Sequence, residues 1–108
     1  MFVLQKERLV KAWPAVVMLP VDGGKVIEEK ITLDMAILDG DGSYKLLSGH
    51  EETFKNVIKG WSGIGGSDGS PLPFNSENLS LLIKDQYFVA AAIRAYQQAA
   101  GGQAAEKN

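Results

Sequence analysis

The side chains that most enzymes and metal sites use are scarce in this chain of 108 residues. It has no cysteine and a single histidine, His50, which precedes Glu51 and Glu52. One imidazole beside two carboxylates could act as an acid–base group, but acidic residues in a first helical turn also stabilise the helix dipole. Without thiols or a second histidine, cysteine nucleophiles and the usual zinc sites are excluded. We therefore predict a polar helix start here, and no catalytic residues.

Two glycine-rich motifs suggest ligand sites but lack the residues that such sites need. Asp39-Gly40-Asp41-Gly42 begins like a calcium loop, yet Tyr44 and His50 stand where an EF-hand has its glycine and its bidentate glutamate. The segment Gly63–Pro71 lacks the Gly-Lys-Ser/Thr of a phosphate-binding loop, and prolines follow it instead of a helix. We expect a solvated turn and a mobile loop, respectively, and no metal, nucleotide or other cofactor.

The composition predicts one small folded domain that binds neither nucleic acid nor membrane. Apolar residues make up 45% of the chain and charged residues 22%, as in ordinary globular proteins. The net charge is -2 and the lysines are scattered, which does not suit a phosphate backbone. Met1–Val10 contains charged residues, unlike a signal peptide, and no apolar run reaches the roughly 20 residues of a membrane span. We expect a cytosolic domain over residues 1–101 and a flexible tail over 102–108.

The N-terminal third predicts two strands joined by a turn. Ala15–Leu19 is rich in β-branched residues, Pro20 closes it, and Val21–Gly24 supplies turn formers. The returning strand has exposed Glu28–Lys30 near its start. Its later apolar residues alternate with smaller or polar ones, which predicts one buried face: Ile31, Leu33, Met35 and Ile37. The sheet is expected to end before Asp39.

A first helix is predicted after the sheet. Ser48 and Glu51 have the spacing of a capping box, so the helix should begin near Ser48 or Gly49 and end at Gly60 or Gly63. Its apolar stripe has helical spacing: Phe54, Val57, Ile58 and Trp61. This stripe predicts that Trp61 is largely buried where the helix meets the sheet.

Two more helices are predicted beyond the glycine-rich loop. Asn75 is a good N-cap for a helix from Ser76 to about Lys84, with Phe74 and Leu79 as a hydrophobic staple. Asp85 can cap a last helix that ends at Gly101-Gly102. Strands followed by helices favour an α+β fold, here an N-terminal antiparallel β-hairpin or small sheet followed by three α-helices.

The last helix and the large aromatic residues are the candidates for contact with another protein. The helix carries an apolar stripe of Phe88, Val89, Ala92, Ile93 and Tyr96. Its alanines Ala90, Ala91 and Ala95 permit close approach of another helix. Because large apolar side chains anchor interfaces, the candidate partner-binding residues are Phe88, Ile93, Tyr96, Trp61 and Phe74. Packing in the core is the alternative role for each.

Three blocks of sequence together resemble the tail assembly chaperones of long-tailed bacteriophages and prophages. The first is Trp13–Gly24, in which a tryptophan precedes a strand that leads into Pro-Val-Asp-Gly-Gly. The second is Val57–Ile64 with Asp68–Asn75, which is similar to the family's Gly-Trp-x-Gly, acidic turn and Pro-Phe-Ser/Thr sequence. The third is Leu81–Tyr96, ending in Ala-Tyr. The order and spacing of the blocks carry the resemblance, which extends over most of the chain.

This resemblance implies a non-enzymatic protein that acts in the host cell cytoplasm during infection and is absent from the virion. It implies binding to the tape measure protein, recruitment of the tail tube protein, and often a longer frameshifted form. The alternatives are a structural minor tail or head–tail joining protein retained in the virion, and a small hydrolase that uses His50. We also expect self-association, because the strand between Trp13 and Pro20 offers a sheet edge and a small domain leaves apolar surface uncovered.

Overall fold

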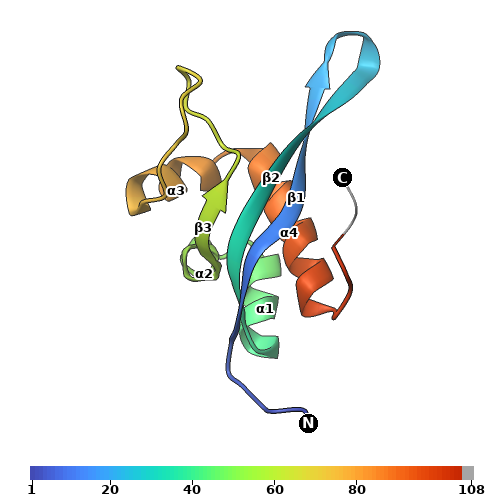
Figure 1. Ribbon diagram of the computed structural model, residues 1–108, viewed down its shortest axis with the longest axis vertical. Coiled ribbons are helices and arrows are strands. Elements are labelled where there is room, and N and C mark those ends of the chain that lie inside the picture. Colours follow the sequence, from blue (N-terminus) through green and yellow to red (C-terminus); the bar gives the residue numbers. More distant parts are fainter. Residues whose placement is uncertain (106–108) are drawn as a thin grey trace.

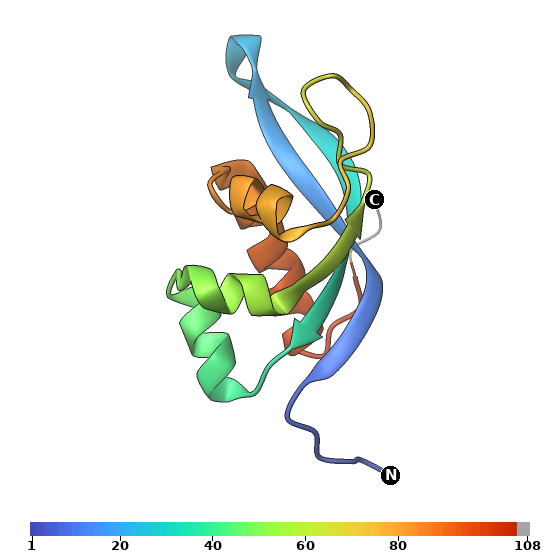
Figure 2. The ribbon, with the colours of Figure 1, turned by 90° about the vertical axis from the view of Figure 1, so that its left-hand side faces the viewer.

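The computed structural model describes residues 1–105 and confirms an α+β fold. Three antiparallel strands form one sheet in the order β1-β2-β3. The helices lie on one side of this sheet (Figure 2). In chain order the elements are β1 Arg8–Val21, β2 Lys25–Ile37, α1 Gly40–Leu47, α2 Glu51–Val57, β3 Ile58–Ser62, α3 Ser76–Ile83 and α4 Gln86–Ala100. The expected flexible tail lies partly outside the described residues, which stop before 106.

The predicted hairpin is present, and its strands are longer than expected. β1 and β2 pair from Val21–Lys25 at the turn to Arg8–Ile37 at the far end. Gly23 and Gly24 have φ values of 79° and 76°, which glycine adopts without strain. The predicted buried face is confirmed for Ile31, Leu33 and Met35, each at most 5% exposed. The hairpin turn projects beyond the helices (Figure 1).

Two prolines determine which backbone groups of β1 face outward. Pro14 is paired with Thr32 and Pro20 with Val26. Proline has no N–H, so the pairs at Pro14 and Pro20 are of the non-hydrogen-bonded type. Because the two types alternate along an antiparallel pair, the backbone N–H and C=O groups of the even-numbered residues of β1 from 14 to 20 point away from β2. The carbonyl of Val16 accepts a hydrogen bond from the Arg94 guanidinium at 2.9 Å. Prolines and this contact leave little of the outer edge of β1 open to another strand.

A β-bulge in β1 is held by a carboxylate from β2. Between the pairs Val10–Met35 and Trp13–Leu33, β1 advances by one residue more than β2. Ala12 in this bulge has a φ of 53°, and its N–H donates to Asp34 Oδ1 at 2.8 Å. On the other side, Asp34 pairs with Gly60 of β3. A Cβ on Gly60 would lie 2.6 Å from Asp34 Oδ2, so any other residue at this position would displace the carboxylate that holds the bulge.

The predicted first helix is wrong in its second half. Phe54, Val57 and Ile58 are buried as the stripe predicted, at 4%, 1% and 1% exposure. However, the helix ends at Val57, and Ile58–Ser62 forms β3. A β-branched pair followed by Gly60 disfavours helix, and β2 offers a strand edge on which those residues bury the same side chains. Trp61 therefore belongs to a strand and is half-buried rather than largely buried.

The Asp-Gly motif and Ser48 also have different roles from those predicted. Asp39 caps α1, because its Oδ1 accepts the N–H of Gly42 at 3.0 Å, so the expected turn is a helix start. Gly42 is needed there, since a Cβ would lie 2.7 Å from Leu38 Cβ. Ser48 ends α1 and donates its hydroxyl to the Tyr44 carbonyl. It forms no capping box.

The two later N-caps are confirmed. Asn75 Oδ1 accepts the N–H of Asn78 at 2.8 Å and begins α3 at Ser76. Asp85 Oδ1 accepts the N–H groups of Tyr87 and Phe88 and begins α4. Short polar side chains before apolar periodic segments therefore located both helices.

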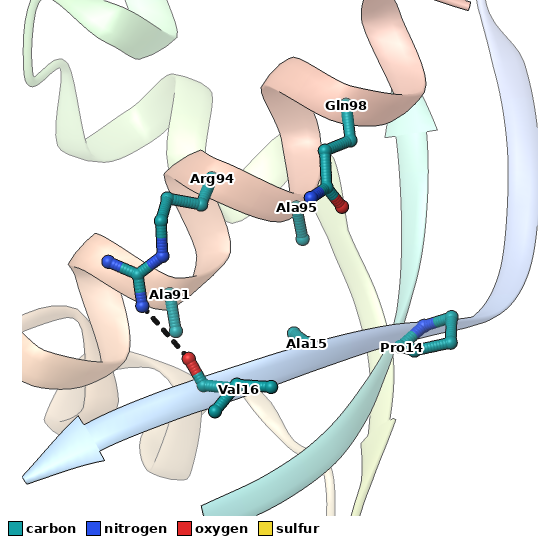
Figure 3. A pocket seen from close by; sticks show the side chains of 7 residues that line it. All are labelled: Pro14, Ala15, Val16, Ala91, Arg94, Ala95 and Gln98. Atoms are coloured by element: carbon teal, nitrogen blue, oxygen red, sulfur yellow. Dashed lines mark hydrogen bonds between the residues drawn. The ribbon is translucent and has the colours of Figure 1, made fainter. Parts of the chain in front are cut away.

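Helix α4 packs on β1 through small side chains. Ala91, Ala92 and Ala95 are 1% to 2% exposed, and Ala15 on β1 is 6% exposed. Figure 3 shows Ala91 and Ala95 facing β1, with Arg94 reaching over to the Val16 carbonyl. A cavity of about 30 Å³ remains at this contact, room for about one or two waters. The alanines therefore bring α4 close to the sheet, whereas Ala90 is exposed.

Tyr96 fixes the other end of α4 to the junction between sheet and helices. Its side chain is 1% exposed. The hydroxyl accepts the backbone N–H of Leu38 at 3.0 Å and forms a 2.6 Å hydrogen bond with Ser43 Oγ on α1. One side chain thus joins α4, the end of β2 and the first turn of α1.

We expect Tyr96→Phe to lower the free energy of unfolding by about 1 to 3 kcal/mol, because the Leu38 N–H loses its partner and the Ser43 hydroxyl keeps only a 3.4 Å contact with the Leu38 carbonyl. Chemical denaturation measures this change. Tyr44→Phe is the matched control, since Tyr44 is 73% exposed, and it should change stability by less than about 0.5 kcal/mol. Equal effects of the two substitutions would contradict the assigned role of the Tyr96 hydroxyl.

We expect Gly60→Ala to destabilise the protein by roughly 1 to 3 kcal/mol, the usual cost of forcing an extra methyl group into a packed site. Gly40→Ala in α1 is the control, because nothing lies within 4 Å of a Cβ built on Gly40. That control should be neutral or stabilising. Thermal melts compare the two, and a Gly60→Ala protein as stable as Gly40→Ala would show that Asp34 can move without loss.

Candidate partner-binding site

Trp61 lies at the centre of an aromatic cluster formed by β3, the segment before α3, and α4. Its ring meets Phe74 edge to face, with centroids 4.8 Å apart, and Phe88 in the same way at 6.5 Å. The indole N–H donates to the Leu72 carbonyl at 2.8 Å. Phe74 remains 42% exposed. The cluster therefore begins in the core at Phe88 and reaches the surface at Phe74.

The five expected partner-binding residues do not form one surface. Phe88 and Tyr96 are 3% and 1% exposed, so their side chains belong to the core and offer almost no area to a partner. Trp61 and Ile93 are half-buried, and only Phe74 is exposed. Ile93 lines a groove to which Trp61, Phe74 and Phe88 do not contribute. An interface through these helices must use their less buried apolar residues.

The first candidate surface is a groove among the four helices, here called the helical groove. It has a volume of about 280 Å³. Its lining is mainly apolar, with Glu51 and Lys84 as the charged members: Leu46, Gly49, Glu51, Phe54, Ile83, Lys84, Val89 and Ile93. Val89 and Ile93 are one helical turn apart on α4 and half-buried. Their spacing suits a helical ligand with apolar residues at i and i+4.

The second candidate surface is a groove beneath the projecting hairpin, here called the hairpin groove. It has a volume of about 320 Å³. The hairpin, the loop after β3, and the junction of α3 and α4 all contribute to its lining: Val17, Leu19, Glu29, Ile31, Gly63, Ile64, Gly65, Leu82, Asp85 and Phe88. Its apolar surface continues toward Val21 and Ile27, which are 42% and 44% exposed on the hairpin.

The loop after β3 is hydrogen-bonded within itself. Gly66 N–H donates to the Ser70 carbonyl at 2.8 Å, and Leu72 N–H donates to the Ile64 carbonyl at 2.9 Å. The Ser70 hydroxyl, and then its backbone N–H, donate to the Asp68 carboxylate and hold its pKa below the usual value. These contacts give the segment the shape of a small hairpin, and they position Ile64 against the hairpin groove.

Most residues that line the two grooves were not among the candidate partner-binding residues. Leu46 lies in α1, of which only the first residues were expected to form a turn, and neither Leu82 nor Ile83 was among the candidate partner-binding residues. The helical spacing of the leucines in α3 could have indicated an apolar face on this helix. Grooves form between elements, however, and the spacing within one element does not show where two others leave a gap.

His50 is exposed and precedes α2, whose first turn contains Glu51 and Glu52 as predicted. Within residues 1–105, no group of three His, Asp or Glu side chains is close enough to hold a metal ion. No helix in the same range has the length and hydrophobicity to cross a membrane.

Compared with known proteins, the chain matches no family model, no curated protein and no solved structure.

We expect Trp61→Ala to cost about 3 kcal/mol of stability, at the lower end for loss of a large aromatic side chain because Trp61 is half-buried. Trp61→Phe should cost less, since a ring remains between Phe74 and Phe88 while the bond to the Leu72 carbonyl is lost. Urea denaturation gives both values. A Trp61→Ala protein with wild-type stability would instead identify Trp61 as a surface residue free to bind a partner.

Proposed function

We propose that this chain is a tail assembly chaperone of a long-tailed phage or prophage that binds a helix of its client in the helical groove. The three sequence blocks support the family, and the groove supports the mode of binding. The protein's own residues leave its apolar lining incompletely covered. On α4, Phe88, Ala92 and Tyr96 are buried in the core, whereas Val89 and Ile93 line the groove. The groove is the observation that carries the proposal.

The chemistry of this groove fits an amphipathic helix. Val89 and Ile93 form one apolar wall and Phe54 contributes from α2, so apolar burial would supply most of the affinity. Glu51 and Lys84 offer opposite charges at the same groove. Such a pair favours one orientation of a charged helix more than it adds affinity.

The client in this proposal is the tape measure protein, whose long apolar helices need protection before the tail forms. The tail tube protein would then be recruited to the complex. Both steps take place in the host cell cytoplasm, and the chain itself performs no catalysis. A small hydrolase that uses His50 is the less supported reading, because the exposed imidazole lines neither groove.

A structural minor tail or head–tail joining protein is the second candidate. The projecting hairpin favours it, because subunits retained in a particle often share strands with their neighbours. Mass spectrometry of purified virions separates the two functions. A chaperone should be missing from the particle, whereas a structural protein should be present in fixed stoichiometry.

We expect Ile93→Asp to weaken binding of a tape measure fragment at least about tenfold, because a carboxylate buried against apolar groups costs more than about 1.4 kcal/mol. Ala90→Asp is the matched control, since Ala90 is exposed on the same helix and does not line the groove. Calorimetry with the fragment encoded beside this gene measures both. Equal affinities for the two folded variants would place the client elsewhere.

A further inference from the structure

β2 extends past β3 toward the hairpin turn, and within residues 1–105 this part of β2 has no neighbouring strand on one side. β3 ends at the pair Thr32–Ser62. Gly63, with a φ of 81°, then turns the chain away. The alternation that the prolines fix on β1 also makes the N–H and C=O groups of Val26, Glu28 and Lys30 point to the side of β3. None of these groups has a backbone hydrogen-bond partner within residues 1–105. Gly63 packs against the Lys30 carbonyl, so the open part of the edge is at Val26 and Glu28.

The hairpin groove lies beside this free edge. Leu19, Ile31 and Ile64 supply apolar surface, and Glu29 and Asp85 are its two charged residues. A strand added to β2 would direct alternate side chains into the groove, because successive residues of a strand point to opposite faces. The site therefore suits an extended apolar segment followed by a basic residue.

Such a segment exists in the chain itself. Met1, Phe2, Val3 and Leu4 are consecutive large apolar residues that lie outside every strand. Phe2 is 80% and Leu4 87% exposed. Arg8 supports the segment by donating to the Val3 carbonyl and by lying 5.3 Å from the centre of the Phe2 ring. In a strand, Lys6 lies on the same face as Phe2 and Leu4, so a segment that inserts those two side chains into the groove also directs Lys6 toward its acidic residues, Glu29 and Asp85.

The segment cannot reach the groove of its own chain. Glu28 pairs with Met18, ten residues along β1 from Arg8, which is roughly 30 Å of strand. Leu4 is four residues from Arg8, and four residues span at most about 14 Å. The start of the chain and the hairpin turn lie at opposite ends of the molecule (Figure 1). The occupant must therefore come from another copy.

We propose that Met1–Leu4 of one copy pairs as a strand with the free edge of β2 in a second copy and inserts apolar side chains into its hairpin groove. Donor and acceptor surfaces lie at opposite ends of the chain, so each copy can give a segment and receive one. The contact is heterologous, and it closes into a ring or continues as a longer assembly. The helical groove takes no part in it, so the proposal is independent of client binding.

Sedimentation velocity across the micromolar range tests the proposal. The wild type should have a mass above one chain that rises with concentration, and Phe2→Asp with Leu4→Asp should be a monomer. Phe2→Leu with Leu4→Ile is the matched control, since it keeps the segment apolar and should keep the association. A monomeric wild type, or a double aspartate variant with the mass of the wild type, overturns the proposal.

A mixing experiment tests the head-to-tail geometry. Glu28→Pro removes an edge N–H that does not pair with β1, and should give a monomer, whereas Glu28→Thr should associate. Leu19→Asp replaces Glu28→Pro if the latter lowers the melting temperature. The Glu28→Pro variant keeps an intact Met1–Leu4 segment, and the double variant with Phe2→Asp and Leu4→Asp keeps an intact β2 edge and hairpin groove. An equimolar mixture of the two should therefore form a one-to-one dimer and nothing larger. Two monomers that stay separate on mixing refute the exchange.

Discussion

The hydrogen bonds of the Tyr96 hydroxyl are the constraint on which the helical layer depends. Tyr96 comes from the last helix, whereas Leu38 and Ser43 belong to the end of the sheet and the beginning of α1. Because the ring is almost fully buried, its hydroxyl must have a partner inside the protein. The position of α4 and the path of the chain out of β2 are therefore determined together, and the remaining helices pack against this fixed pair.

A layer of helices on one side of a three-stranded sheet leaves two kinds of surface uncovered. Short helices around α4 do not close over Val89 and Ile93, which leaves the helical groove. β1 and β2 are also much longer than β3, so the hairpin extends past the helices. The two sides of this ribbon differ. Prolines and Arg94 occupy much of the outer edge of β1. The edge of β2 between the hairpin turn and the end of β3 carries free backbone groups.

The sequence predicted the features that depend on neighbouring residues. The hairpin turn follows from Asp22-Gly23-Gly24, the buried face of β2 from its alternation, and the starts of α3 and α4 from Asn75 and Asp85. Features that depend on distant residues were missed. Ile58–Ser62 has helical spacing but pairs with β2, and Asp39 starts a helix whose Leu46 is buried under other elements. For the candidate site residues, the sequence did not show which side chains lie in the core and which at the surface. Phe88, Ile93 and Tyr96 belong to one helical stripe and differ only in which other residues cover them.

The bulge at Lys11 and Ala12 sets the phase of the first strand. It lets Val10 and Trp13, three residues apart, face the same side of the sheet opposite Met35 and Leu33. Loss of one residue there would turn Arg8–Val10 over, exposing Val10 and directing Leu9 inward, while the rest of β1 stayed in place. The length of this segment is therefore under stronger constraint than its composition. A substitution at Lys11 changes one solvent-facing side chain, whereas deletion of a single codon exchanges the buried and exposed faces of Arg8–Val10.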